Sequence, residues 1–389
     1  MQKTDRGYVL AYWLQYPSAN FGFDNNEVIE MGMLSGFFSD DLAIDLGTVN
    51  TIVYAPTQGV VLNEPSVLAL HKYSREVLSV GSQALKLLGR EPNDTEVYRP
   101  IRRGAIDNFE ISQEFLRALI SRVQHNDHPK RSHLVIGVPG SSTPLERRSV
   151  KDAARDAKAG RVDLIDEGLA AALGAGLEFE DEQAHLVVDI GGGTTNIAIL
   201  ASGGVVSSVS VPAAGNSMDE AIQDYLRVRH AAHIGERTAE RVKRELGLAW
   251  QTESGERTEM ELEVVGKQLA NGMALPITIN SREVRGAIEP VLAEIISAVR
   301  RVIEDSKPEV TADIYYSGVT LTGGGALLSG MAERLQNDLN LRVSVPDDPL
   351  TTVALGAGRL LGEPEKLQRA ALRLDVPAWE NAEKLVVNW

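Results

Sequence analysis

The sequence predicts a layered α/β protein made of two similar halves around a cleft. A hairpin pattern occurs twice, at residues 41–54 and 185–200, each time with apolar strands around a turn that contains glycine and threonine. A strand, helix, strand and helix follow one another from residue 133 to a helix that begins near Leu169, an order typical of layered α/β domains. The chain has 389 residues, of which 43% are hydrophobic, so two large units are expected.

In the first half, residues 59–107 are expected to form strands and a small, charged α/β insertion. The run at 133–138 is apolar on both faces, which predicts a central strand. The other expected elements are a helix at 112–124, a helix with Thr143 as N-cap, Pro144 at its first position, Glu146 in a capping box and Gly160 as its stop, and a strand at 161–165.

The second half is expected to alternate strands and helices and to carry a solvent-facing, β-rich lobe. After the second hairpin, the expected elements are a strand at 203–211, helices at 218–229 and 234–246, the β-rich lobe at 250–282, a helix at 281–306 interrupted near Pro290, a strand at 318–322, the turn Gly323–Gly325 and a helix at 326–339.

Composition excludes several classes of protein. The formal net charge of −15 argues against a general nucleic-acid binder, which needs a basic face. The chain has no cysteine, which excludes disulfides, thiolate metal sites and cysteine nucleophiles and fits a reducing cytosol. No apolar run approaches the ~18 residues that span a bilayer, and residues 1–30 lack a secretory signal pattern. We therefore expect a cytoplasmic location.

The N-terminal residues allow two interpretations. Residues 1–30 show weak periodicity and are expected to be a poorly ordered extension, and Met31 offers a second start. The segment Met33–Phe38 has an apolar helical face that would make weak direct contact with a membrane. The alternative is a short hydrophobic clasp on the domain, which is slightly favoured because residues 31–40 contain no Lys or Arg.

The turns of the two hairpins have the chemistry of a phosphate and metal site. Glycines let backbone N–H groups approach an anion, threonine hydroxyls add donors, and Asp45 or Asp189 at a strand end can hold a hydrated cation. The pair Asp166-Glu167 and the turn Gly323–Gly325 add an acid and a further close approach of backbone. For the turn in residues 185–200 taken alone, an ordinary Gly-rich turn is an equal alternative.

Together these elements resemble the actin-like ATPase superfamily, which also contains heat-shock chaperone ATPases and sugar kinases. From about Phe37 to Leu361 the chain is similar to the MreB family of bacterial actin homologues. The stretches that carry this similarity are Gly59-Val-Val-Leu-Asn-Glu-Pro-Ser-Val67, Leu87-Leu-Gly-Arg90, Arg99-Pro-Ile-Arg-Arg-Gly-Ala-Ile-Asp107, Leu145-Glu-Arg-Arg148, Met218-Asp-Glu-Ala221, Ile234-Gly-Glu-Arg-Thr-Ala-Glu240 and Leu321-Thr-Gly-Gly-Gly-Ala-Leu-Leu328.

The resemblance implies a binding site for ATP and Mg²⁺ between the two halves. Asp45 and Asp189 would hold Mg²⁺ mainly through water, and Glu167 would orient the attacking water. The implied nucleotide-binding residues are Asp45, Gly47, Thr48, Val49 and Asn50 in the first loop, Asp189, Gly191, Gly192, Gly193, Thr194 and Thr195 in the second, Glu240 and Lys243 at the ribose, and Gly323, Gly324, Gly325 and Ala326 on the adenosine side.

Two of these assignments have structural alternatives. Glu240 and Lys243 are one helical turn apart and, on spacing alone, are better explained as a solvated ion pair. Glu167 would also suit the first turn of a helix, where the helix dipole favours an acid.

The chain departs from the family pattern at three positions. Gly168 stands where the family usually has proline, so the start of the helix loses a residue that pre-sets its conformation. The Glu167 carboxylate is therefore expected to be held less firmly, and ATP hydrolysis is expected to be slower. Val49 replaces a commoner alanine, and Asn196 replaces a commoner glutamate. Neither change removes a ligand, because contacts in such loops are mostly made by backbone.

The resemblance also implies domains. These are an N-terminal extension (1–36), a first actin-like domain (37–168 with a small subdomain at about 69–110, completed by 351–361), a second (169–350 with a small subdomain at about 208–285) and a C-terminal extension (362–389).

The function that the resemblance implies is an ATP-dependent filament that organises cell shape and wall synthesis at the inner face of the plasma membrane. Its expected partners are copies of itself and membrane-associated cell-wall elongation proteins, with no nucleic acid. The alternatives are a metabolic kinase on the same fold and a nucleotide-binding scaffold that polymerises with little hydrolysis. A chaperone is disfavoured, because too little chain follows residue 361 for a peptide-binding domain.

Overall fold

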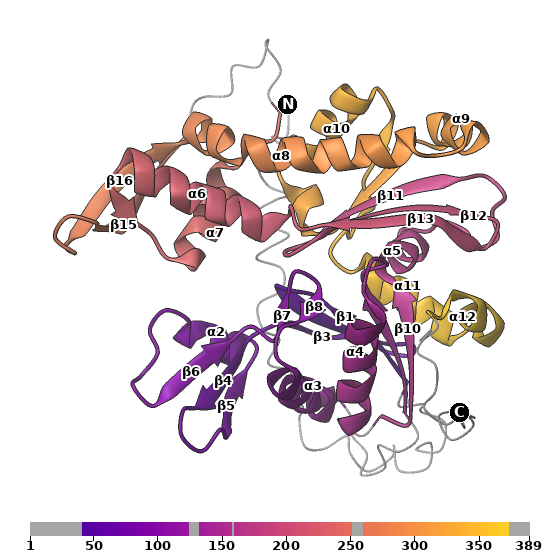
Figure 1. The fold of residues 1–389 in the computed structure, drawn as a ribbon, viewed down its shortest axis with the longest axis horizontal. Helices are drawn as coiled ribbons and strands as arrows, with labels where there is room; N and C mark the ends of the chain where they lie inside the picture. The colour runs from indigo at the N-terminus through magenta and orange to yellow at the C-terminus, as the bar shows by residue number, and fades with distance from the viewer. Residues whose placement is uncertain (1–40, 124–131, 158, 251–259, 373–389) are drawn as a thin grey trace, which may run out of the picture. The chain divides into compact units, whose positions relative to one another are not determined.

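The computed structural model describes residues 41–123, 132–157, 159–250 and 260–372. The predictions for the N-terminal extension, for Met33–Phe38 and for residues 373–389 lie outside this part of the chain. The described residues fall in one compact unit, and Figure 1 labels most of its helices and strands.

Two five-stranded sheets with the same plan form the framework. The first has the order β10-β9-β1-β2-β3 and the second β13-β12-β11-β17-β18. In each, the first strand of a hairpin pairs antiparallel with the second and parallel with a later strand on its other side. Their strands are β1 (Leu42–Leu46), β2 (Asn50–Ala55), β3 (Gly59–Pro65), β9 (His133–Val138), β10 (Arg161–Asp166), β11 (His185–Ile190), β12 (Thr195–Ala201), β13 (Gly204–Val211), β17 (Val319–Thr322) and β18 (Val343–Ser344).

The repeated plan confirms the prediction of two similar halves. β1 corresponds to β11, and each ends in an aspartate followed by one apolar residue and the turn. Burial of nearly every residue in β9 agrees with its prediction as a central strand.

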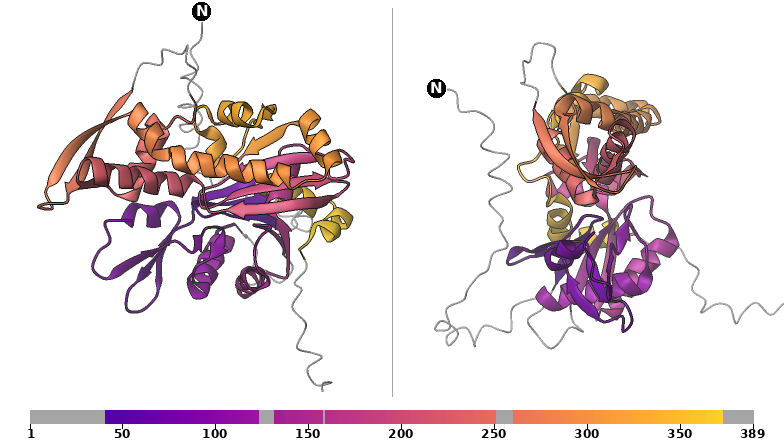
Figure 2. Two further views of the ribbon diagram at one scale, coloured as in Figure 1. Left: turned by 45° about the horizontal axis from the view of Figure 1, so that its top comes forward. Right: turned by 90° about the vertical axis from the view of Figure 1, so that its left-hand side faces the viewer.

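Three smaller sheets complete the strands of the described chain. One has the order β5-β4-β6, another β14-β15-β16, and β7 pairs with β8. Figures 1 and 2 show β15 and β16 as a two-stranded arm, residues 261–280, which lies within the predicted β-rich lobe. The bounds are β4 (Leu68–His71), β5 (Val77–Val80), β6 (Thr95–Tyr98), β7 (Ile101–Arg102), β8 (Ala105–Ile106), β14 (Ala232–His233), β15 (Glu261–Gln268) and β16 (Ala274–Asn280).

Helices lie close to their predicted positions. Thr143 caps the helix that Pro144 begins, and its capping box with Glu146 is complete, as predicted. The helices are α2 (Ser82–Leu87), α3 (Phe109–Val123), α4 (Pro144–Asp156), α5 (Glu167–Gly174), α6 (Gly215–Arg229), α7 (Glu236–Leu246), α8 (Ser281–Glu304), α9 (Pro308–Ser317), α10 (Met331–Leu339), α11 (Thr352–Leu361) and α12 (Pro364–Ala370).

Two helix predictions are wrong. Helix α8 runs without interruption through Pro290, because its long buried stripe packs into the core of the second half, and this packing outweighs the lost hydrogen bond. The helix expected from residue 326 begins only at Met331, after a 3₁₀ turn at Gly324–Leu327. Gly330 adopts a left-handed φ of 78° there, and a side chain on it would collide with the backbone of Trp250.

Helices α5 and α11 pack together at the centre of the molecule (Figure 1) and are the reason why the two halves share a core. A Cβ atom on Gly174 would lie 1.8 Å from the carbonyl oxygen of Thr352, and one on Gly356 would lie 1.8 Å from that of Ala170. The two backbones therefore touch directly. This contact fixes α5, whose first residue is Glu167.

Candidate functional site

The first turn, residues 47–49, is fixed by hydrogen bonds from Ser66. The Ser66 hydroxyl donates to the carbonyl of Gly47 at 2.6 Å and lies 2.9 Å from the Thr51 hydroxyl, while the Ser66 N–H donates to the carbonyl of Val49 at 2.8 Å. These buried bonds fix the turn that follows Asp45. Sequence reasoning did not single out Ser66, although it lies in one of the stretches that carry the family resemblance.

The second turn, residues 191–194, is tied to the start of α6. The N–H groups of Gly215 and Asn216 donate to the carbonyls of Gly191 and Gly192 at 3.1 and 2.8 Å. The Thr195 hydroxyl donates to the carbonyl of Ala213 at 2.6 Å. The hydroxyl of Thr195 thus supports the turn from within the core, where the residue is fully buried.

The two turns approach each other closely enough that only glycine fits. A Cβ atom on Gly192 would lie 2.1 Å from Cγ2 of Val49, and one on Gly193 would lie 2.4 Å from the hydroxyl oxygen of Thr48. The same hydroxyl accepts a hydrogen bond of 3.1 Å from the N–H of Gly104. The structure therefore brings together the two loops that the sequence predicts as a phosphate site.

Three carboxylates converge beside these turns. Burial and the neighbouring Asp189 raise the pKa of Asp45 from an ordinary 3.8 to about 8, and burial raises that of Asp189 to about 6. Burial, followed by the charges of Asp45 and Asp189, raises the pKa of Glu167 well above its ordinary value. The charge of Asp189 opposes the ionisation of Asp45, and the charges of both oppose that of Glu167, as expected where a cation is to be received.

These carboxylates fit a hydrated Mg²⁺ ion. Among the described residues, no three His, Cys, Asp or Glu side chains are grouped so that they could hold a metal directly. Mg²⁺ keeps several of its waters and is commonly bound through one or two carboxylates together with substrate phosphates. Asp45 and Asp189 supply two carboxylates that a cation would help to ionise.

The raised pKa of Asp45 predicts that the stability of the folded protein depends on pH. We expect Asp45→Asn to raise the thermal midpoint of the nucleotide-free protein by about 3 °C near pH 8, and by less near pH 5. The folded-state pKa exceeds the unfolded value, so the folded protein holds more protons between pH 3.8 and about 8, and wild-type stability falls as pH rises through that window. Asparagine does not titrate, so the stability of the variant does not fall with pH for this reason.

Thermal unfolding at both pH values, without Mg²⁺ and nucleotide, measures the effect. If Asp45→Asn changed the thermal midpoint by the same amount at both pH values, or lowered it, burial of the Asp45 charge would carry little cost.

Glu167 is held directly by Asn196, and the start of its helix is held through Asp166. Its Oε2 atom accepts a hydrogen bond of 2.6 Å from Nδ2 of Asn196 on β12, and only 7% of the residue is exposed. Asp166 caps α5 by accepting from the N–H of Leu169 at 3.0 Å, and Ser208 on β13 donates to Asp166 at 2.9 Å. This cap serves the helix start at which the family's proline is missing.

Gly168 is required by packing. A Cβ atom on it would lie 2.4 Å from Cβ of Ala198 on β12. We therefore expect Gly168→Ala to lower the free energy of unfolding by about 1–3 kcal/mol through overpacking. Ala198→Gly should restore part of that loss in the double variant, with a coupling of about 1 kcal/mol measured by urea unfolding. Additive losses would show that the two positions do not clash.

The turn Gly323–Gly325 lies against the end of β11. A Cβ atom on Gly323 would lie 2.3 Å from Oδ1 of Asp189, and one on Gly325 would lie 2.2 Å from the side chain of Ile190. The turn continues through Gly324 and Ala326 in a 3₁₀ helix. The third glycine element of the sequence thus adjoins the second turn.

Lys243 reaches the same region, but its ion pair differs from the one considered from sequence. Its Nζ donates to Asp219 at 2.8 Å and to the carbonyl of Gly215 at 2.9 Å. Glu240 lies one turn earlier on α7 and is half-buried. Burial raises the pKa of Asp219 to about 6, and the Lys243 charge partly offsets this rise.

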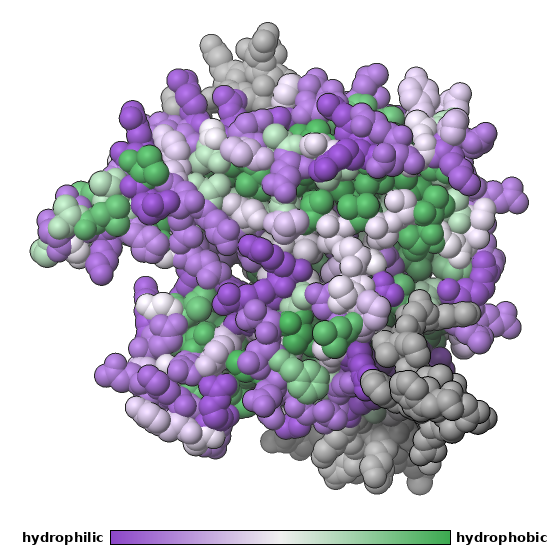
Figure 3. All heavy atoms as spheres, viewed as in Figure 1, coloured by the Kyte–Doolittle hydropathy of each residue, from purple (hydrophilic) through white to green (hydrophobic). Residues whose placement is uncertain are grey.

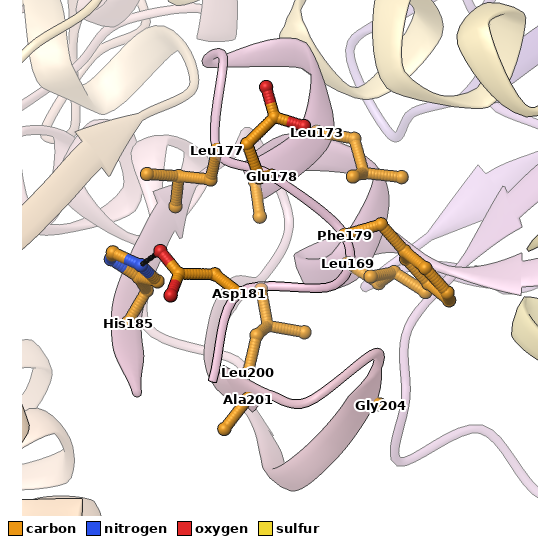
Figure 4. Close-up of a pocket in the computed structure, with 11 residues that line it drawn as sticks. Leu169, Leu173, Leu177, Glu178, Phe179, Asp181, His185, Leu200, Ala201 and Gly204 are labelled. Carbon is orange, nitrogen blue, oxygen red and sulfur yellow. Dashed lines mark hydrogen bonds and ion pairs between the residues drawn. The ribbon is translucent and has the colours of Figure 1, made fainter. Parts of the chain in front are cut away.

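A separate small cavity lies between α5 and strands β11 and β12 (Figure 4). It holds about 10 Å³, close to the least that a water molecule needs, and Asp181 and His185 form a 2.8 Å hydrogen bond on its wall. None of the predicted nucleotide-binding residues lines it.

The chain is similar to known proteins over most of its length. The family described as MreB/Mbl protein matches residues 39–369. Cell shape-determining protein MreB of Escherichia coli (strain K12) is 42% identical over 331 residues, covering 84% of this chain and 94% of that protein. Cell shape-determining protein Mbl of Bacillus subtilis (strain 168) is 37% identical over 335 residues, covering 86% and 99%.

Solved structures show the same fold. MreB5 of Spiroplasma citri, in crystals bound to AMPPNP, has a TM-score of 0.79 at 32% identity and covers 84% of this chain and 96% of that one. Its ADP-bound form gives 0.78 at 31% identity, with 84% and 97% covered. The subunit of a MamK double helical filament shares the fold, with a TM-score of 0.70 at 21% identity. The fold is that of the actin-like ATPases, and the chain belongs to the MreB/Mbl protein family.

Proposed function

We propose that this chain binds ATP with Mg²⁺ between its two glycine turns, hydrolyses it slowly, and polymerises into filaments that organise cell shape and wall synthesis at the inner face of the plasma membrane. The observation that carries the proposal is the close approach of the turns at Gly192 and Gly193 to Val49 and Thr48, with Glu167 beside them. Two turns that face each other this way present backbone N–H groups to one polyphosphate.

Each element has a role in this proposal. Gly47–Asn50 and Gly191–Thr194 bind the phosphates, Thr195 supports the second loop from the core, and Gly323–Ala326 lies on the adenosine side. Glu240 and Lys243 contact the ribose. The Lys243 ammonium group would bind the ribose while it keeps its ion pair with Asp219. Mg²⁺, held by Asp45 and Asp189 through water, would neutralise phosphate charge. Glu167 orients the attacking water, and a single fixed carboxylate suffices because phosphoryl transfer depends mainly on positioning.

The arm at residues 261–280 supports self-assembly. Val265, Leu269 and Met273 are 60%, 55% and 64% exposed, and Figure 3 shows apolar side chains at the end of this arm. Exposed apolar groups gathered in one place are typical of protein interaction surfaces. A head-to-tail contact whose rotation does not close would generate a filament.

Sedimentation and electron microscopy with and without ATP test the proposal. We expect pelletable filaments with ATP and Mg²⁺, together with release of phosphate. Protein that stays monomeric at high concentration in both states would contradict it. Phosphorylation of a sugar or acid panel without filaments would favour the metabolic kinase, and filaments without phosphate release would favour the scaffold.

Attachment to the membrane is a separate part of the proposal. Among the described residues, no helix has both the length and the apolar character that crossing a bilayer requires. We propose a weak contact through Met33–Phe38 and recruitment by membrane-associated cell-wall elongation proteins. Co-sedimentation of filaments with anionic vesicles, compared between wild type and the double variant Phe37→Ser and Phe38→Ser, tests the direct contact.

A further inference from the structure

Asn196 lies between two of the three carboxylates. It is on β12 directly opposite Asp189 in the β11–β12 register and is 3% exposed. Its Nδ2 donates to Oε2 of Glu167 at 2.6 Å. The amide group therefore holds the candidate water-orienting acid and adjoins a candidate metal-holding acid.

The other end of the same side chain has no partner. Oδ1 of Asn196 is among the few buried polar atoms of the described chain that make no hydrogen bond. Leaving a buried acceptor unsatisfied lowers the stability of the fold. The donors of the amide are drawn to the carboxylates, so Oδ1 cannot turn toward Glu167 without placing two acceptors against each other. Oδ1 is enclosed by protein atoms, so the amide acts on the site through its Nδ2 donor.

We propose that Asn196 is a positioning residue for hydrolysis: its Nδ2 fixes the Glu167 carboxylate in the orientation that directs the attacking water. This inference rests on the proposed ATPase function. The water oxygen forms a bond to the terminal phosphorus, and the bond from that phosphorus to the bridging oxygen breaks, with its electron pair leaving on ADP. The water proton passes to the released phosphate by way of Glu167.

The chemistry of an amide suits this place. Asn196 supplies both a donor and an acceptor and adds no charge to a site that already holds Asp45, Glu167 and Asp189. An aspartate of the same shape would lose the donor and bring a further carboxylate. An alanine would lose the donor without adding charge.

The test compares Asn196→Asp and Asn196→Ala with wild type in two measurements. Phosphate release per unit of polymer reports the hydrolysis step, and the dissociation constant for AMPPNP with Mg²⁺ reports binding. We expect both variants to lose about 10–100-fold in hydrolysis while their AMPPNP affinity stays within about 3-fold. Asn337→Asp, on the exposed face of α10, makes the same chemical change and should leave both measurements unchanged.

Thermal unfolding with AMPPNP shows whether each variant is folded, and the alanine variant keeps the test valid if the added charge prevents folding of the aspartate variant. Wild-type hydrolysis in either folded variant would overturn the inference. A parallel loss of hydrolysis and AMPPNP affinity would also overturn it, because that pattern indicates a general support of the site. Failure of wild type itself to bind AMPPNP or release phosphate would instead reject the proposed function.

Discussion

Glu167→Gln is expected to lower the rate of ATP hydrolysis by about 10²–10³-fold while ATP binding changes little. The glutamine has nearly the same shape and can still meet Asn196, but it cannot take a proton from water. The side chain lies at the first residue of α5, which the contact with α11 holds rigidly, so the loss should come from chemistry and not from a displaced helix.

Single-turnover phosphate release and AMPPNP binding measure the two effects separately. Filaments should still form with ATP and should persist longer, because the nucleotide state changes slowly. Glu178→Gln, in the loop after α5, serves as the matched control. Phosphate release at the wild-type rate in the Glu167 variant would exclude a role for this carboxylate and would favour the scaffold with little hydrolysis.

Asp189→Asn is expected to remove most of the Mg²⁺ dependence of ATP binding. The structure places this carboxylate at the end of β11, between the second turn and Gly323, with 6% of its surface exposed. Groups that hold a metal through its outer shell commonly contribute about 10–100-fold to metal affinity. The variant should bind Mg²⁺-free ATP as well as wild type or better, because one buried negative charge is gone.

Titration of ATP binding with and without EDTA measures this difference. Asp224→Asn, on the exposed face of α6, is the matched control and should behave as wild type. An unchanged Mg²⁺ effect in Asp189→Asn would remove this residue from the metal site and leave Asp45 as its sole candidate.

Local signals in the sequence were sufficient to predict most of the strands and helices. The two hairpins, the central strand β9 and the capped helix α4 each depend on residues that are close in the chain, and all are confirmed. Their repetition also led to the two-halved fold. The interrupted helix at Pro290 was wrong because tertiary burial decided the outcome, which local propensity does not include.

The details of the site could be predicted only in part. The two turns were found because glycine, threonine and aspartate recur in the same order. Three contacts of the site join residues that are far apart in the chain. They are the hydrogen bond from Ser66 to Gly47, the backbone contact of Gly174 with Thr352 and the hydrogen bond from Asn196 to Glu167, with separations of 19, 178 and 29 positions. No local pattern reports such pairs, although the departure from the family at Asn196 marked one of them.

A crystal structure with AMPPNP and Mg²⁺ tests the central claim most directly. The account predicts the phosphates between Gly47–Asn50 and Gly191–Thr194, a hydrated metal beside Asp45 and Asp189, and a water held by Glu167 in line with the terminal phosphate. A nucleotide bound elsewhere, or a Glu167 side chain turned away from the terminal phosphate, would contradict it.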